Sequence, residues 1–461
     1  MSVRYISTRG GEPLSFSDAV IAGLAVDGGL FVPDSVPDVS AELDDWRGLD
    51  YASLAERVMQ PYVDVPADVL KDLVSRSYSV FSRDDVVPLV SVGDLSILEL
   101  FHGPTLAFKD IALQFLGNLF EHLLDVRDAR LNILAATSGD TGSAAIYGVR
   151  GRSRMRIFVT YPDGRVSPMQ ELQMTAVDDE NVFNLALQGT FDDCQAIVKA
   201  VLGDVEFKER FALGSVNSIN WARVLAQVVY YFYSAFRVME QRKAAVVDFC
   251  VPTGNFGDVY AGYVAWRMGL PIRKLVVATN ENDILARFFA GSDYSRGEVQ
   301  ATISPSMDIQ IASNFERYLF DRVGCEPARL SALMNNFASS GVLSAGSLDP
   351  AAANDPFCAG SADVTQTLET IRQVHADYGY VLDPHSAVGV HVGQAHRDPD
   401  VPMICLATAH PAKFGDAVQR AIGEQVRHPI LEALHDVPRR RTVMPASEDA
   451  VRQVIFEHAG R

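Results

Sequence analysis

Short apolar runs alternate with amphipathic stretches from about residue 93 onward, and glycines or helix-capping residues separate them. Apolar runs of this length predict buried strands, and the amphipathic stretches predict helices. Because parallel strands need a crossover helix between them, the alternation predicts an α/β protein with a mainly parallel sheet. The predicted strands are LNILAAT (131–137), RIFVTY (156–161), NVFNLALQG (181–189), AVVDFCV (245–251) and KLVVAT (274–279).

The helices between these strands are predicted from their start signals. One helix is expected from Ser143 and another over Pro168–Thr175, and Thr190 is expected to cap a third that runs through Leu202. These elements divide the chain into a mostly helical N-terminal region (1–92), a smaller α/β domain (93–210), a larger α/β domain (211–414) and a helical C-terminal tail (415–461).

The composition is that of a folded, acidic protein. Of the 461 residues, 48% are hydrophobic, which excludes a disordered chain, and the formal net charge is −18. An acidic chain repels nucleic acid and anionic membranes, so neither is expected as a partner. The N-terminus lacks an apolar signal segment, and the longest helix-like apolar stretch, 226–236, is far short of a bilayer span. We therefore expect a cytoplasmic protein.

Cysteine and histidine show no metal-binding pattern. The five cysteines are far apart without a CxxC pair, and no HExxH occurs, so no metal is expected. The absence of a GxSxG elbow disfavours a serine hydrolase.

Lys109 is one of only seven lysines, and it lies in the segment FHGPTLAFKDIALQFLGNLF. It follows Phe108 and precedes an apolar helical run. An ammonium in such surroundings loses hydration, so its pKa should fall and its neutral amine can attack a carbonyl. The alternative is a lysine whose stem packs on apolar surface while its head reaches solvent.

Two glycine-containing turns follow predicted strands and open helices. SGDTG (138–142) follows the strand at 131–137, and GNFG (254–257) follows the strand at 245–251. Successive backbone N–H groups at a helix start can hold a carboxylate or a phosphate. GNFG is neither GxGxxG nor a P-loop, which disfavours a dinucleotide site. SGDTG could also be a tight turn from strand to helix with Ser or Asp as the cap.

A third polar group precedes an apolar helix in SVNSINWARVLAQ. Asn217, Ser218, Asn220 and Arg223 lie at or just before its first turn. An arginine beside a helix N-terminus would favour a second phosphate. The alternative is ordinary N-capping with an exposed arginine.

Taken together, these segments resemble the threonine synthase family in its long bacterial and fungal form. The resemblance runs nearly end to end, and the order of the motifs is specific although each motif alone is weak. The similar segments are STRGGEPLSFSDAVIAGLAVDGGLFVPDSVP, LFHGPTLAFKD, ATSGDTGSAA, GSVNSINWAR, VPTGNFGDVYAGY, ISPSMDI, SNFERYLF, YVLDPHSAVG and ATAHPAKF.

The resemblance implies a fold type II pyridoxal 5′-phosphate enzyme, similar to tryptophan synthase β, with the active site between two domains that contain parallel sheets. It implies a lyase that converts O-phospho-L-homoserine and water to L-threonine and phosphate, the last step of threonine biosynthesis. The protein would act on this small molecule as a monomer or homodimer, and its domains would close over the substrate.

The resemblance also implies the site residues. Lys109 would bind the cofactor covalently and act as the catalytic base. Further cofactor contacts would come from Gly254, Asn255, Phe256, Gly257, Asp258 and Thr408, the last at the pyridine nitrogen. Substrate contacts would come from Ser138, Asp140, Thr141, Asn217, Ser218 and Arg223. His385 and Lys413 lie in family-like segments, but the sequence suggests no role for either.

Asp140 and the reaction type leave alternatives open. Many relatives of this fold type have Asn at the position of Asp140, and a carboxylate cannot donate to the cofactor's phenolate oxygen unless it is protonated. The same fold could serve a phospho-lyase or a threonine/serine dehydratase that releases a 2-oxo acid, although a dehydratase has no use for a second phosphate site. A non-enzymatic binding protein would be expected to have a damaged lysine or phosphate loop, and both are intact.

Overall fold

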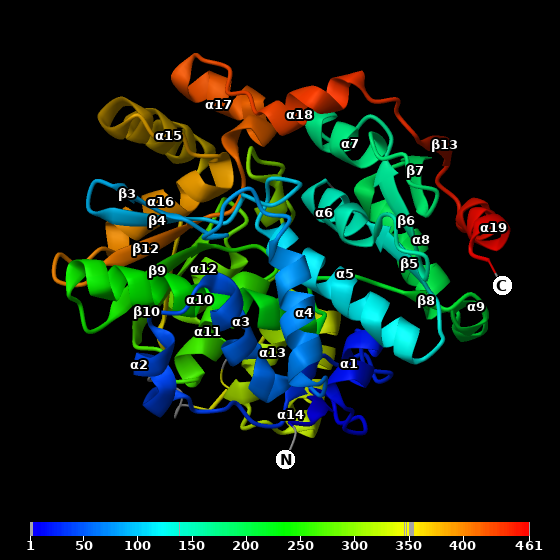
Figure 1. Ribbon diagram of the computed structural model, residues 1–461, viewed down its shortest axis with the longest axis horizontal. Helices are drawn as coiled ribbons and strands as arrows, with labels where there is room; N and C mark the ends of the chain where they lie inside the picture. Colours follow the sequence, from blue (N-terminus) through cyan, green and yellow to red (C-terminus); the bar gives the residue numbers. More distant parts are fainter. Residues whose placement is uncertain (1–2, 138, 345, 347, 350–354, 461) are drawn as a thin grey trace.

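The structure is a computed structural model that describes residues 3–137, 139–344, 346, 348–349 and 355–460. Two helix-covered sheets form its body (Figure 1). The six-stranded sheet consists, in spatial order, of β11 (Phe357–Ser361), β10 (Ile272–Thr279), β9 (Val247–Pro252), β12 (Met403–Ala407), β4 (Leu95–Glu99) and β3 (Leu89–Val92). The five-stranded sheet consists of β13 (Thr442–Pro445), β7 (Val182–Gln188), β6 (Met155–Pro162), β5 (Leu131–Ala136) and β8 (Leu213–Gly214).

Neighbouring strands in both sheets pair in parallel, apart from the antiparallel pair of β3 and β4. This confirms the predicted mainly parallel α/β fold. A separate antiparallel pair near the N-terminus joins β1 (Tyr5–Ser7) and β2 (Phe31–Pro33).

Helices connect and cover these strands. The N-terminal region contains α1 (Phe16–Ala22), α2 (Leu43–Trp46), α3 (Tyr51–Met59) and α4 (Ala67–Tyr78). The next helices are α5 (Lys109–Val126), α6 (Asp140–Val149), α7 (Pro168–Thr175), α8 (Phe191–Gly203), α9 (Val205–Arg210), α10 (Trp221–Arg242), α11 (Gly257–Arg267), α12 (Ile284–Gly291), α13 (Phe315–Arg322) and α14 (Pro327–Ser340). The C-terminal part contains α15 (Val364–Tyr378), α16 (Pro384–His396), α17 (Gly415–Ile422), α18 (Pro429–Ala433) and α19 (Glu448–His458).

The predicted strands and start signals are largely confirmed. The five apolar runs form β5, β6, β7, β9 and β10, and α7 has the predicted bounds. The Thr190 side chain accepts a hydrogen bond from the Asp193 backbone and completes a capping box for α8. The start of α6 differs from the prediction: the helix begins at Asp140 rather than at Ser143. The Thr137 hydroxyl accepts hydrogen bonds from the N–H groups of Gly139 and Gly142, so it caps the helix directly after β5.

Four strands depart from the domain ranges predicted from the sequence. β3 falls in the range 1–92 but pairs with β4 in the six-stranded sheet, and β8 falls in the range 211–414 but pairs with β5 in the five-stranded sheet. β4 falls in the range 93–210 but pairs with β12 in the six-stranded sheet. β13 falls in the range 415–461 but pairs with β7, at one edge of the five-stranded sheet (Figure 1). Tertiary packing determines which strands pair, and the order of strands along the sequence does not predict it. The four-part division therefore stays a prediction, and these four strands are exceptions to it because each pairs in a sheet outside its predicted range.

α10 is the central helix of the core. Every residue from Trp221 to Phe236 is buried, and its aromatic side chains contact the N-terminal region, as in the pair Tyr51 and Tyr233 with ring centroids 5.2 Å apart. A helix buried all round is expected to be apolar. The polar residues Arg223 and Gln227 at its start are therefore candidates for function. Within the described ranges, no helix combines the length and apolar character that crossing a membrane requires.

Candidate active site

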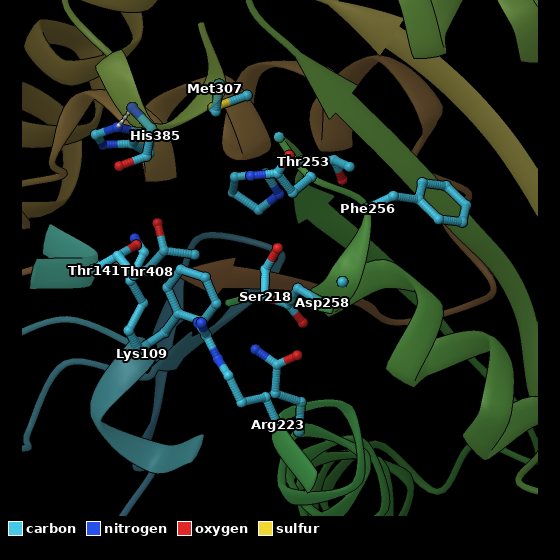
Figure 2. Close-up of a pocket in the computed structure, with 17 residues that line it drawn as sticks. Lys109, Thr141, Ser218, Arg223, Thr253, Phe256, Asp258, Met307, His385 and Thr408 are labelled. Carbon is cyan, nitrogen blue, oxygen red and sulfur yellow. Dashed lines mark hydrogen bonds between the residues drawn. The ribbon is translucent and has the colours of Figure 1, made fainter. Parts of the chain in front are cut away.

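One cavity brings most of the predicted site residues together (Figure 2). It lies at the carboxyl ends of β9 and β12, where α/β proteins commonly bind ligands. The predicted residues that line it are Lys109, Thr141, Ser218, Arg223, Gly254, Asn255, Phe256, Gly257, Asp258 and Thr408. Asp140 lies beside Lys109, Asn217 is exposed and outside the lining, and Ser138 lies outside the described residues.

Lys109 is the first residue of α5, and it is only 8% exposed. Its Nζ lies 4.7 Å from the centre of the Phe108 ring and 3.7 Å from Oδ2 of Asp140. Burial lowers the pKa of Lys109, the nearby cations Lys413 and Arg223 lower it further, and Asp140 opposes them. Lys109 is therefore a buried amine biased toward its neutral, nucleophilic form. The alternative of a lysine with a solvated head is wrong.

Asp140 is held in its ionised form. Its Oδ1 lies 3.0 Å from Nζ of Lys413 and accepts a hydrogen bond of 2.9 Å from the Gln170 side chain. Burial alone would raise the pKa of Asp140, but Lys413, Lys109 and Gln170 together hold it well below its usual range. The carboxylate is thus an acceptor only, and it cannot donate a hydrogen bond.

GNFG forms the turn from β9 into α11. Phe256 has φ 64°, in the left-handed region, and its ring points away from the cavity into an aromatic cluster (Figure 2). Phe256 therefore contributes backbone rather than side chain to the cavity. A Cβ on Gly254 would lie 2.5 Å from the backbone oxygen of Ser306, so only glycine fits there without displacement. Among the described residues, nothing accepts a hydrogen bond from the N–H groups of this turn.

Asp258 follows this turn and is buried. Its Oδ1 accepts hydrogen bonds of 2.5 and 2.9 Å from the hydroxyls of Tyr230 and Tyr231. Its Oδ2 has no hydrogen-bond partner among the described residues. Burial raises the pKa of Asp258 to about 6, and the two tyrosines oppose this rise.

Arg223 and Gln227 lie one turn apart on α10, and both side chains line the cavity. Arg223 is 4% exposed and donates to the Val216 carbonyl at 2.9 Å, while its buried Nε has no partner among the described residues. Burial lowers the pKa of Arg223 to about 10. The predicted alternative of an exposed arginine is wrong, although Asn220 does cap α10 as expected, by accepting from the Ala222 N–H.

Hydrogen bonds hold both the backbone N–H and the backbone carbonyl of Thr408. Its N–H donates to Ser386 at 3.0 Å, and its carbonyl accepts from the Phe108 N–H at 2.8 Å. The Ser386 hydroxyl donates in turn to Asp383, the N-cap of α16. The side chain of Thr408 is therefore presented to the cavity by a rigid frame.

His385 and Ser306 join this frame to Asp140. The Ser306 N–H donates to Nε2 of His385 at 3.2 Å, and Nδ1 of His385 lies 2.8 Å from Asp383. Because a backbone N–H can only donate, Nε2 is an acceptor and the ring proton lies on Nδ1. The Ser306 hydroxyl lies 3.5 Å from Asp140. No role was predicted for Ser306, His385 or Lys413, although each lies in a family-like segment.

These features fit pyridoxal 5′-phosphate. The unpaired N–H groups at the start of α11 suit its phosphate, the buried amine of Lys109 suits its aldehyde, and Thr408 offers a neutral hydroxyl. The Nε of Arg223, which no described residue contacts by a hydrogen bond, offers a second anion site. Within the described part of the chain, no group of three or more His, Cys, Asp and Glu side chains could hold a metal ion.

Comparison with known proteins decides the family. The chain is 46% identical to threonine synthase of Pseudomonas aeruginosa, over 100% of this chain and 99% of the other. The chain belongs to the threonine synthase family. The threonine synthase of Schizosaccharomyces pombe is 47% identical over 91% of this chain and 89% of its own.

Family models and solved structures agree with threonine synthase membership. Residues 4–78 match "Threonine synthase N terminus", 92–328 match "Pyridoxal-phosphate dependent enzyme" and 386–455 match "Threonine synthase, C-terminal". The crystal structure of the PLP-bound threonine synthase from Brucella melitensis has a TM-score of 0.96 and 45% identity, and covers 100% of both chains. The yeast threonine synthase structure has a TM-score of 0.94 and 43% identity, and covers 99% of this chain and 98% of its own. The predicted fold type II enzyme and its pyridoxal phosphate cofactor are thereby confirmed.

Proposed function

We propose that this threonine synthase family member converts O-phospho-L-homoserine and water to L-threonine and phosphate, with pyridoxal 5′-phosphate as cofactor. The observation that carries the proposal is the buried lysine Lys109, which shares one cavity with two separate anion-binding groups. One group is the start of α11, and the other is Arg223 with Ser218. A cofactor and a substrate that each bear a phosphate require such a pair.

Each predicted residue has a place in this proposal. The N–H groups of residues 254–257 would hold the cofactor phosphate, and Asp258 would support them from the second residue of α11. Thr408 would meet the pyridine nitrogen. Thr141 and Ser138 would hold the substrate carboxylate, beside Asp140. Asn217, exposed in this structure, would join Ser218 and Arg223 when the site closes.

The chemistry divides between cofactor and protein. Bound pyridoxal phosphate supplies the electron sink that allows protons to leave the carbons near the substrate's amino group. Lys109 removes and returns these protons, because its surroundings favour the neutral amine. Arg223 holds the phosphate as it departs, and its burial strengthens that interaction. Closure would keep bulk water out until the step that consumes water.

The second anion-binding group also bears on the alternatives. A threonine/serine dehydratase acts on a substrate without phosphate. A buried Arg223 whose Nε has no partner among the described residues therefore argues against it. A phospho-lyase would use the same residues and would differ only in where water enters. From the sequence resemblance we also propose that the protein works in the cytoplasm as a monomer or homodimer, without a nucleic-acid or membrane partner.

Product analysis tests the reaction. We expect the purified holoenzyme to release L-threonine and phosphate in equal amounts from O-phospho-L-homoserine. Release of 2-oxobutanoate and ammonia in place of threonine would establish a lyase instead.

Borohydride reduction followed by peptide mapping tests the lysine. The label is expected on Lys109, with Lys413 as an internal control because it is also buried beside Asp140. A label on Lys413 would overturn the site assignment.

A further inference from the structure

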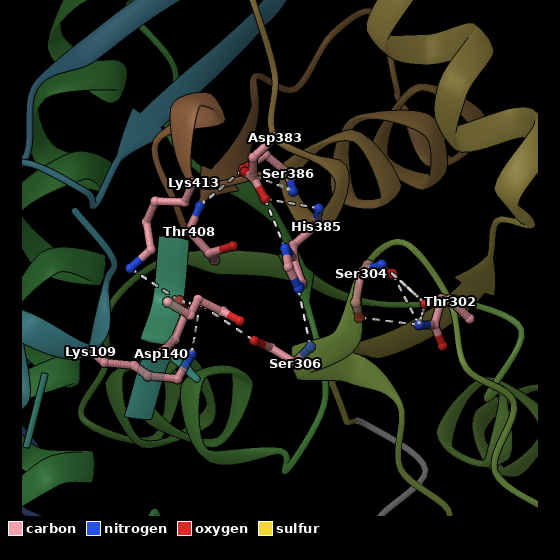
Figure 3. A network of polar contacts seen from close by, with 12 residues as sticks. Lys109, Asp140, Thr302, Ser304, Ser306, Asp383, His385, Ser386, Thr408 and Lys413 are labelled. Atoms are coloured by element: carbon pink, nitrogen blue, oxygen red, sulfur yellow. Dashed lines mark hydrogen bonds and ion pairs between the residues drawn. The ribbon is translucent and has the colours of Figure 1, made fainter. Parts of the chain in front are cut away.

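Two lysines share the single carboxylate of Asp140 (Figure 3). Nζ of Lys413 lies 3.0 Å from Oδ1, whereas Nζ of Lys109 lies 3.7 Å from Oδ2. Both contacts are ion pairs, and the attraction is stronger in the shorter one. Lys413 is therefore the main ion-pair partner of Asp140, and the ion pair between Lys109 and Asp140 is the weaker of the two.

Lys413 is held firmly in this position. Its side chain is 0% exposed, and Nζ also donates to the Thr105 carbonyl at 2.7 Å. Thr105 is itself fixed, because its N–H and hydroxyl donate to Asp110 at 2.8 and 2.7 Å. The Thr105 carbonyl and the Asp140 carboxylate together fix the position of this buried side chain.

The other charged and titratable groups around Lys109 come from several elements. Asp140 begins α6, Arg223 lies on α10, Asp258 lies on α11, and His385 on α16 faces Asp140 through Ser306. Two of these groups, Asp140 and Asp258, favour a charged lysine. Arg223 and Lys413 oppose them. Lys413 is the one of these cations that directly contacts Asp140, the carboxylate nearest to Lys109.

We propose that Lys413 is a positioning residue that occupies Asp140 and so leaves Lys109 free to lose its proton and react with the aldehyde of the cofactor. In that reaction the neutral amine attacks the aldehyde carbon, a C=N bond forms and water leaves. Without Lys413, Asp140 would turn to the ammonium of Lys109 and hold its proton. This inference rests on the proposed function, which assigns the cofactor to Lys109.

The test measures covalent capture of the cofactor rather than turnover. Full-length protein freed of cofactor is mixed with pyridoxal phosphate across a pH series, quenched with borohydride, and the label on Lys109 is quantified by peptide mapping. In Lys413→Met the pH midpoint of labelling should rise by about one unit, which makes labelling near pH 7 about tenfold slower. Lys413→Arg, which keeps the charge, should stay close to wild type.

Two further variants complete the design. Asp140→Asn removes the shared carboxylate, so the midpoint should fall instead of rise. Lys71→Met removes one exposed lysine from α4 and should leave the midpoint unchanged. Folding of each variant is checked by circular dichroism.

The outcomes separate this inference from the proposed function. A folded Lys413→Met with the wild-type midpoint overturns the positioning role while Lys109 keeps its assignment. If Lys413→Met does not fold, Lys413→Gln, which also removes the charge but keeps a polar head, is measured in its place, and a wild-type midpoint in that variant overturns the role. A wild-type label on another lysine overturns both proposals.

Discussion

Replacing Asp258 by asparagine should remove one source of pH-dependent stability. Asp258 is buried, two tyrosine hydroxyls donate to its Oδ1, and its Oδ2 has no partner among the described residues. Burial raises the pKa of Asp258 to about 6, with the tyrosines opposing. Asparagine has nearly the same shape, keeps an acceptor for both tyrosines and carries no charge.

The magnitude follows from the two pKa values. A carboxyl group whose pKa is raised by folding binds its proton more tightly in the folded state, so it stabilises the fold at low pH only. With an unfolded pKa of about 3.9 and a folded pKa of about 6, its contribution is about 1.4 kcal/mol near pH 5 and close to zero near pH 8. The stabilisation is therefore lost as pH rises through the folded pKa.

Denaturant unfolding of cofactor-free wild type and Asp258→Asn, from about pH 5 to about pH 8, measures this loss. The free energy of unfolding of the wild type should fall relative to the variant by about 1.4 kcal/mol over that range. Burial also raises the pKa of Asp110 to about 6, but Asp110 is present in both proteins and cancels in the difference. Parallel curves would refute the raised pKa of Asp258.

Two further predictions concern the two anion-binding groups. Gly254→Ala should weaken pyridoxal phosphate binding about tenfold and lower the free energy of unfolding by about 1–3 kcal/mol, because the new Cβ meets the Ser306 carbonyl. Equilibrium dialysis and denaturant unfolding measure these changes, and Gly203→Ala, with open space around its Cβ, is the control that should leave cofactor affinity unchanged. Arg223→Ala should lower kcat/KM for O-phospho-L-homoserine by about 100-fold or more while cofactor affinity stays unchanged. Loss of the cofactor in that variant would show that the two phosphate sites had been exchanged.

The fold was predictable where local signals are strong. β5 to β7 and α8 follow from apolar runs and from the capping box at Thr190. β12 and β4 were not predicted, because runs as short as MICLA fit a buried strand or a buried helix equally well. β8 has only two residues, and most of β11 is half-buried, so neither leaves a clear pattern.

The candidate site was predictable where one residue type has a distinctive chemistry. Lys109, GNFG and Arg223 were candidates from their neighbours, the family resemblance implied their roles, and the structure places them around one cavity. The contacts of Asp140 were not predictable. Ser306 is 166 residues from Asp140, and Lys413 is 308 residues from its acceptor Thr105, so no local pattern records either contact. The one available signal was that Lys413, one of seven lysines, lies in the apolar segment PAKF.

The burial of Arg223 shows why sequence and structure give different answers about the same residue. In sequence, an arginine in the first turn of a helix is usually solvated, and Asn220 does cap this helix as such a pattern predicts. In the structure, α10 is enclosed on all sides, so the guanidinium loses its hydration, and its Nε has no partner among the described residues. An uncompensated buried charge destabilises a fold by several kcal/mol, and an anion that binds it removes that penalty. Because a ligand that binds only the folded state adds to its stability, we expect that the phosphate proposed to bind Arg223 would gain affinity by removing this penalty.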